Sequence, residues 1–300
     1  MNATSPIGRP SGLGLFLAVT FTTSWASWLV AIRLGGSSTS SPTVLPYLFG
    51  AFGPSIGALA VRAHRARRGH PVPEHTVRLR LGLRLFWVAP LLLVTSATVL
   101  AGVLAAHLWG GPAVSLPEAQ DVIRTAGGPA AFLVGMLIGG PLAEEPGWRG
   151  TAHPRLRASL GRYRTGLVLG AIWAVWHLPL FFIDGTVHAT FGLASWSGLL
   201  FMLSAIPMSL LAGYAYDRAG VPGAIAVHFA ANSSLLLLGV DSPRAQALVM
   251  AVQTVVALAL LATERSPRNT GPSPAHRPHP PHTESTAPTA PTDQEHRARV

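Results

Sequence analysis

The chain has 300 residues, of which 49% are apolar and 11% charged, and its mean hydropathy is +0.39, values typical of multi-pass membrane proteins rather than water-soluble domains. The formal charge of +10 comes from arginines that lie mostly in short segments between apolar runs, a pattern that orients membrane proteins and does not indicate a nucleic-acid partner. The absence of cysteine excludes disulfides, thiolate metal sites and a cysteine nucleophile.

Eight segments approach the roughly 20 apolar residues that a helix needs to cross the hydrocarbon core of a membrane. The first is interpreted as a retained span, because one arginine precedes it and no convincing signal-peptide cleavage site is present. We therefore predict an all-α bundle of about eight transmembrane helices. They cover approximately residues 12–33, 44–63, 85–109, 129–146, 165–184, 195–216, 222–240 and 243–263.

Two loops carry clusters of arginine, and the positive-inside rule predicts that both face the cytoplasm. With eight spans, the N- and C-termini are then cytoplasmic as well, and we expect a multi-pass protein of the plasma membrane. The first loop contains Arg62, Arg65, Arg67, Arg68, Arg78, Arg80 and Arg84, and the second contains Arg155, Arg157, Arg162 and Arg164.

The last part of the chain differs in composition from the rest. From residue 264 it is rich in Pro, Thr, Ser and His and has almost nothing to bury. We predict a membrane domain over residues 1–263 and a disordered cytoplasmic tail over 264–300.

Ionisable side chains inside a bilayer are costly unless they face a cavity or a partner, so each one is a candidate for function. The polar residues that lie in the predicted spans or at their edges are Glu144, Glu145, His177, His228 and Asn232. Because His228 and Asn232 are four residues apart, they share one face of a helix.

Each of these residues also has a purely structural explanation. A single histidine in an apolar helix can simply be hydrogen-bonded in the core, and Asn232 could join two helices. Glu145 and Arg149, at i and i+4, could form an ion pair at a helix end. The whole set is harder to explain in this way, because three spans contribute polar groups at a depth where lipid offers no partner.

The helix that carries the two glutamates is expected to break directly after them. Pro146 lacks a backbone donor and Gly147 loosens a helix, and non-helical backbone at this depth requires surrounding protein or a water-filled cavity. A simple helix end at the membrane surface would explain the same residues. Pro179, two residues after His177, predicts a similar break in the fifth span.

These side chains could together hydrolyse an amide. A buried glutamate is a usable base because burial disfavours its charged form, whereas Arg149 keeps the nearer carboxylate ionised. His228 and Asn232 could donate hydrogen bonds to the oxygen that gains negative charge when water attacks a carbonyl. A proton-coupled transporter is the alternative, because glutamates and histidines inside helix bundles also relay protons.

Four short motifs bear a family resemblance. EEPGWRG at 144–150, HPRL at 153–156, WHLPLFF at 176–182 and HFAAN at 228–232 follow one another in the chain. Together they resemble the CAAX-protease and bacteriocin-processing (CPBP, or Abi) family of intramembrane proteases, over about residues 129–236. Trp173 stands where the eukaryotic members usually have phenylalanine, which we expect to change only a packing group.

The resemblance implies that Glu144 activates the attacking water together with His177, and that His228 and Asn232 line the oxyanion site. Glu145 and Arg149 would hold this cluster in shape. The expected reaction is hydrolysis of a peptide bond, without a covalent intermediate, in a peptide or membrane-associated protein. A binding or immunity protein that keeps the fold without turnover is a further alternative.

The need for a metal stays open at this point. Glu144, His177 and His228 could hold a zinc ion with an open coordination position, and a metal-free glutamate base is equally reasonable chemically. We lean towards no tightly bound structural zinc. The predicted partners are the substrate and the lipid bilayer, with no nucleic acid.

Overall fold

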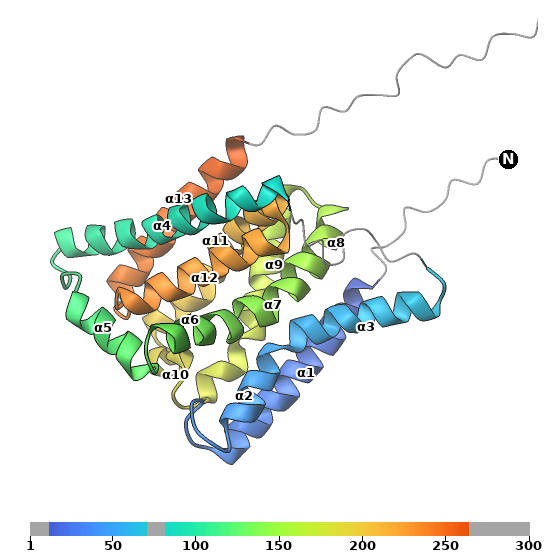
Figure 1. The fold of residues 1–300 in the computed structure, drawn as a ribbon, viewed down its shortest axis with the longest axis horizontal. Coiled ribbons are helices and arrows are strands. Elements are labelled where there is room, and N and C mark those ends of the chain that lie inside the picture. The colour runs from blue at the N-terminus through green and yellow to red at the C-terminus, as the bar shows by residue number, and fades with distance from the viewer. Residues whose placement is uncertain (1–11, 71–81, 264–300) are drawn as a thin grey trace, which may run out of the picture. The chain divides into compact units, whose positions relative to one another are not determined.

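The computed structural model describes residues 12–70 and 82–263. All regular elements in these two ranges are helices, and neither range contains a strand, which confirms the predicted all-α class (Figure 1). The predicted tail over 264–300, and Arg78 and Arg80 of the first arginine loop, lie outside the described residues.

The helices include one π-helix, η2, and two 3-10 helices, η1 and η3. In chain order they are α1 (Leu13–Leu34), α2 (Val44–Ala51), α3 (Gly53–Arg67), η1 (Leu83–Trp87), α4 (Val88–Leu108), α5 (Leu116–Thr125), α6 (Pro129–Ile138), α7 (Pro141–Gly147), η2 (Trp148–Ala152), α8 (His153–Arg157), α9 (Arg162–Trp176), η3 (Leu178–Phe182), α10 (Val187–Phe191), α11 (Trp196–Ala219), α12 (Val221–Leu237) and α13 (Pro243–Thr263).

Each predicted span coincides with one helix or with a short series of helices. By length and composition, five helices of the described chain could cross a membrane, or seven spans if two bent pairs are each counted as one. The pair of α2 and α3 is bent by 49°, and the α5 helix meets the segment Pro129–Arg157 at 76°. The remaining predicted span is α12, which is apolar but has only 17 residues. The cytoplasmic location of the termini stays a prediction.

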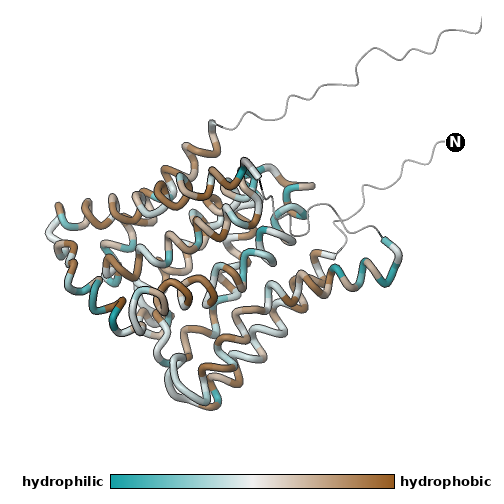
Figure 2. The backbone as a smooth tube through the Cα atoms, in the orientation of Figure 1, coloured by the Kyte–Doolittle hydropathy of each residue, from teal (hydrophilic) through white to brown (hydrophobic). Residues whose placement is uncertain are grey.

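The α11 helix lies in the middle of the bundle, packed against α9, α12 and α13. It carries small side chains such as Ala205, Ala212 and Ala215, which are buried and let neighbouring helices approach closely. Apolar residues run along the helices, whereas hydrophilic ones gather on α5 and at the end of α3 that leads to Arg67 (Figure 2). This distribution is the one that a helix bundle in lipid requires.

The α3 helix holds the glutamate-bearing α7 at close range. Ser55 Oγ donates a hydrogen bond to the carbonyl oxygen of Ala143 at 2.6 Å. A Cβ built on Gly147 would lie 2.4 Å from the carbonyl carbon and oxygen of Pro54. Gly147 therefore fits here because the backbone of α3 occupies the place where a side chain would go.

We expect the substitution Gly147→Ala to lower the thermal unfolding midpoint, with a cost of about 1–3 kcal/mol for the overpacking of a tight contact. A suitable control is Gly135→Ala in α6, where the added Cβ would have no heavy atom within 4 Å. That control should be neutral or stabilising, because alanine is the better helix former. Equal unfolding midpoints for the two variants would contradict this account of the α3–α7 contact.

The predicted break at Pro146 and Gly147 is wrong in its position. Both residues lie inside α7, and the helix continues through the π-helix η2 into α8. The interruption lies instead at Gly139 and Gly140, between α6 and α7. The π turn lies after Pro146, and Thr151 Oγ1 donates a hydrogen bond to the Pro146 carbonyl oxygen at 3.3 Å. In the fifth span the predicted change near Pro179 is confirmed, because α9 ends at Trp176 and η3 follows.

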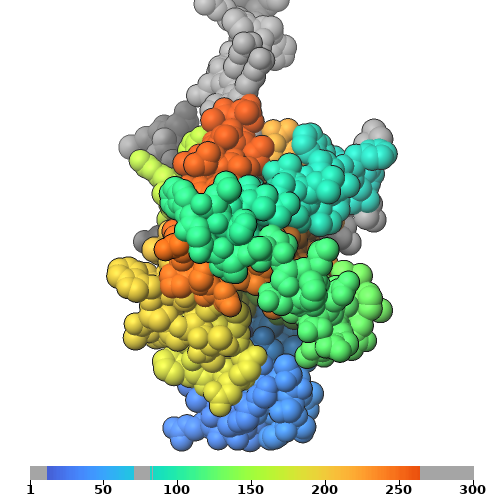
Figure 3. Space-filling view, turned by 90° about the vertical axis from the view of Figure 1, so that its left-hand side faces the viewer, coloured from blue at the N-terminus to red at the C-terminus, as the bar shows by residue number. Residues whose placement is uncertain are grey.

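The α5 helix lies in a segment that we predict as a loop between spans. Ser115 caps it by accepting a hydrogen bond from the backbone N–H of Glu118, in a Ser-x-x-Glu pattern typical of helix starts. None of its residues is buried. Figure 3 shows this end of the molecule, with α5 in the middle and α10 beside it.

Candidate active site

Three helical segments bring the predicted residues together. The α7 helix carries Glu144 and Glu145, the end of α9 carries Trp173 and His177, and α12 carries His228 and Asn232. The α7 helix packs directly against α12. Glu144, Glu145 and His228 are 5%, 0% and 3% exposed, so their polar atoms depend on one another for partners.

Glu145 links two of the predicted residues. Its Oε1 accepts hydrogen bonds from Arg149 Nη1 at 3.0 Å and from His228 Nδ1 at 2.8 Å. The Arg149 guanidinium is also fully buried and lies 4.4 Å from the centre of the Trp173 ring. The arginine favours the ionised form of Glu145, and this carboxylate in turn fixes the proton of His228 on Nδ1.

Glu144 has a different partner, although it is the neighbouring residue. Its Oε2 accepts a hydrogen bond from Trp173 Nε1 at 2.8 Å. The sequence suggested only a packing role for Trp173, and that interpretation is incomplete, because the indole orients a carboxylate. The other oxygen of Glu144 remains available to a reactant.

The available oxygen of Glu144 faces a small space beside Gly140. A Cβ built on Gly140 would lie 3.4 Å from Glu144 Oε1, 3.5 Å from His228 Nε2 and 3.6 Å from Asn232 Nδ2. Three polar atoms from two helices thus surround one position that a larger residue would fill. The glycine pair at 139–140, shortly before the glutamates, is the sequence signal for this position.

The ring of His177 lies beside the ring of Trp173. Its Nδ1 is 2.8 Å from the carbonyl oxygen of Trp173, and because a carbonyl only accepts, Nδ1 carries the proton and Nε2 the lone pair. The centre of the Trp173 ring is 5.6 Å from that of His177 and 5.1 Å from that of His228. No hydrogen bond joins His177 to Glu144 among the described residues.

His188 in α10 is a further buried histidine that the sequence did not single out. Its ring stacks on His177 with a centroid distance of 5.4 Å and an interplanar angle of 23°, and Phe201 approaches it at 4.4 Å. Burial lowers the pKa of His188 well below its usual value of 6.5, and the neighbouring His177 lowers it further. His188 is therefore neutral at physiological pH. It lies in a short segment between two predicted spans, and that segment has no hydrophobic periodicity that could reveal a buried residue.

We expect Trp173→Phe to lower kcat about tenfold with little change in KM, because a hydrogen bond to a carboxylate contributes roughly 1.5 kcal/mol or more. Phenylalanine keeps an aromatic ring under Arg149 but removes the donor to Glu144. Steady-state kinetics on a model peptide would measure the change. The matched control is Trp28→Phe, which removes a buried indole donor to the Tyr47 carbonyl instead. A wild-type kcat for Trp173→Phe would contradict the positioning role.

The donor set is a poor fit for a divalent metal. In the part of the chain that the structure describes, no three His, Asp or Glu side chains are arranged to hold an ion. Asn232 Nδ2, which borders the space beside Gly140, is a hydrogen-bond donor and cannot ligate a cation. The predicted ligand His177 has its Nε2 open, as a metal ligand would, but it is not among the atoms nearest to the space beside Gly140. The chemistry below is therefore derived from the side chains.

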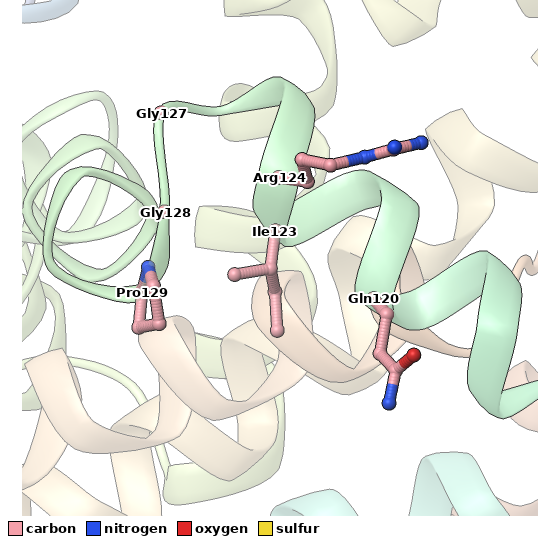
Figure 4. A pocket seen from close by; sticks show the side chains of 6 residues that line it. All are labelled: Gln120, Ile123, Arg124, Gly127, Gly128 and Pro129. Carbon is pink, nitrogen blue, oxygen red and sulfur yellow. The ribbon is translucent and has the colours of Figure 1, made fainter.

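A larger open pocket of about 530 Å³ lies away from this cluster. It is formed at the turn between α5 and α6, and its lining residues are Gln120, Ile123, Arg124, Gly127, Gly128 and Pro129 (Figure 4). Its lining includes no carboxylate and no histidine. The carboxylate, imidazole and amide groups of the predicted site lie beside Gly140 and do not line this pocket, so the size of the pocket does not identify the candidate active site.

Comparison with known proteins gives two matches. The sequence model of a family described as type II CAAX prenyl endopeptidase, Rce1-like, matches residues 126–234. The chain is also 26% identical over 234 residues to CAAX prenyl protease 2 of Methanococcus maripaludis, an alignment that covers 75% of this chain and 84% of that protein. The residues matched by the family model include every residue of the predicted site.

Proposed function

Since the chain belongs to the CAAX-protease and bacteriocin-processing family and is a CAAX-type membrane protease, we propose that it cleaves peptide bonds with a water molecule activated by Glu144. The observation that carries this mechanism is the convergence of Glu144 Oε1, His228 Nε2 and Asn232 Nδ2 on the space beside Gly140. A base and two groups that can stabilise an oxyanion thus lie within 3.6 Å of one position.

Glu144 acts as the general base. Its Oε1 takes a proton from water while Trp173 holds Oε2, so the carboxylate does not have to reorient during attack. The water oxygen bonds to the carbonyl carbon, and the proton then passes from Glu144 to the nitrogen of the departing amine. The Nε2 lone pair of His177, whose ring lies 5.6 Å from that of Trp173, provides a second acceptor near the site.

His228 and Asn232 stabilise the oxygen that becomes negative. Asn232 Nδ2 donates as it stands, and the His228 ring borders the same position with its Nε2. The Glu145 carboxylate accepts the hydrogen bond from His228 Nδ1 and pairs with Arg149, so it holds the imidazole ring in place. Glu145 and Arg149 are thus positioning residues, whereas Glu144, His228 and Asn232 contact the reacting atoms.

The substrate that we propose is a protein segment at or in the membrane. The site is built from helices that are apolar enough to lie in a bilayer, so a substrate reaches it most directly from lipid. The relative from Methanococcus maripaludis is named a prenyl protease, and we propose that this chain likewise acts on a lipid-associated peptide.

We place the protein in the plasma membrane, with its arginine-rich loops in the cytoplasm. A topology reporter at residue 70 is expected to give a cytoplasmic signal.

The purified protein in liposomes tests the proposal against the transporter alternative. We expect release of new peptide termini from a diverse peptide panel, detected by mass spectrometry, with many turnovers per protein molecule. Substitution His228→Ala should abolish that release. Binding without turnover would indicate an immunity or binding protein, and a proton leak without cleavage would indicate a transporter, so either result would overturn the mechanism.

Chelation addresses the open question of the metal. Because Glu144, His177 and His228 do not form a three-ligand site, we expect cleavage to continue after treatment with a strong chelator. Peptide release before and after treatment measures this directly. Loss of activity that zinc then restores would show that the side chains rearrange around a metal and would contradict the mechanism.

A further inference from the structure

The two ends of the bundle differ strongly in charge. At the end where α3, α8 and α11 finish, the described residues include ten arginines and a single aspartate, Asp217. The opposite end has three arginines and four carboxylates. The ten arginines are Arg62, Arg65, Arg67, Arg68, Arg84, Arg155, Arg157, Arg162, Arg164 and Arg218.

Arg155 stands apart from the other arginines at this end because it is only 8% exposed. Its Nη1 donates to the carbonyl oxygen of Thr151 at 2.7 Å. Its Nη2 is shielded from solvent and makes no hydrogen bond among the described residues. Its electrostatic neighbours are Arg65 of α3, a like charge that repels it, and Tyr216, which acts in the opposite sense.

A comparison with Arg149 shows what Arg155 lacks. Both guanidinium groups are buried on the same continuous stretch of helix, but Arg149 pairs with Glu145 at 3.0 Å. No described carboxylate pairs with Arg155. The one described carboxylate at this end, Asp217, lies 3.7 Å from His153 Nε2 instead. A buried cation beside a second cation is unfavourable unless an anion completes the site.

We propose that Arg155 and Arg65 bind the phosphate of an anionic lipid headgroup at the arginine-rich end of the bundle. A guanidinium presents paired donors that match phosphate oxygens, and basic pockets between membrane helices bind such headgroups. The site lies between α3 and α8, where Gly12 and Val61 pack beside Arg155. The surrounding excess of arginine favours a headgroup with net negative charge over a zwitterionic one.

The position of this site links lipid binding to the catalytic helix. Arg155 is tied to Thr151 in η2, and η2 follows directly on the helix that carries Glu144 and Glu145. An anion that neutralises Arg155 therefore stabilises the end of the helix on which the catalytic carboxylates stand. Anionic lipid should raise both the unfolding midpoint and the cleavage rate.

The full chain in lipid nanodiscs provides the test. We compare phosphatidylcholine alone, phosphatidylcholine with roughly one third phosphatidylglycerol, and phosphatidylcholine with added inorganic phosphate. We expect phosphatidylglycerol to raise the unfolding midpoint of the wild type by several degrees, and Arg155→Gln to lose most of this shift. Arg65→Gln should lose part of it, and Arg155→Lys should retain part, since lysine keeps the charge without the paired donors.

The matched control is Arg67→Gln, which removes one exposed charge from the same end of the bundle. If Arg67→Gln loses as much of the shift as Arg155→Gln, general surface charge is responsible and the site is wrong. A full shift with inorganic phosphate would overturn the lipid assignment.

If Arg155→Gln does not fold, native mass spectrometry of Arg155→Lys and Arg65→Gln still measures retained phosphatidylglycerol. Retention equal to that of the wild type refutes the site. If anionic lipid does not raise the unfolding midpoint of the wild type, the proposal is wrong.

Discussion

Replacing Glu144 with glutamine is expected to lower kcat/KM for peptide hydrolysis about a thousandfold while leaving the protein folded. Glutamine has nearly the same shape, and its amide oxygen can still accept the hydrogen bond from Trp173 Nε1. It cannot take a proton from water at neutral pH. The loss should therefore appear in turnover and not in the unfolding midpoint.

Two measurements make this result interpretable. Peptide cleavage and thermal unfolding are recorded on the same preparation, so that a misfolded variant is recognised. The substitution Glu118→Gln, at an exposed carboxylate on α5, serves as the control and should leave both values unchanged. Wild-type cleavage by Glu144→Gln would remove the base from the mechanism. Loss of folding in that variant would instead make Glu144 a structural residue.

The second large effect is expected from Arg149→Gln, which should reduce the free energy of unfolding by about 3–5 kcal/mol. Arg149 and Glu145 are both fully buried and 3.0 Å apart, so removing the cation leaves a buried carboxylate that retains only the hydrogen bond from His228. The variant should also lose activity, because Glu145 positions His228 at 2.8 Å. Thermal or denaturant unfolding in detergent measures the stability term.

The chain provides a closely matched control for this variant. Arg124 and Asp121 on α5 form an ion pair at 2.8 Å, but their side chains are 79% and 65% exposed. We expect Arg124→Gln to cost less than about 1 kcal/mol, since water screens an exposed pair. If both substitutions had the same small effect, the buried pair would not be an important contributor to the stability of the site.

The fold class and the spans follow from local properties of the sequence. A run of apolar residues such as 196–216 has to be helical in lipid, because only a helix satisfies every backbone group within the segment. The eight predicted segments therefore coincide with helices even though no partner for any of them was known. The misplaced break at Pro146 has the opposite cause. Pro146 lies within α7, and the sequence does not reveal whether the surrounding helices let a helix continue past a proline.

The identity of the site residues was also accessible from the sequence, because charged and polar groups in an apolar span need a special reason to be there. What each of them contacts depended on the tertiary structure. Two adjacent glutamates point in different directions along a helix, so whether Glu144 or Glu145 meets Arg149, Trp173 or His228 is decided by the packing of α9 and α12 around α7. The position beside Gly140, and a buried arginine at position 155 with no carboxylate partner among the described residues, likewise arise from contacts between segments distant in the chain.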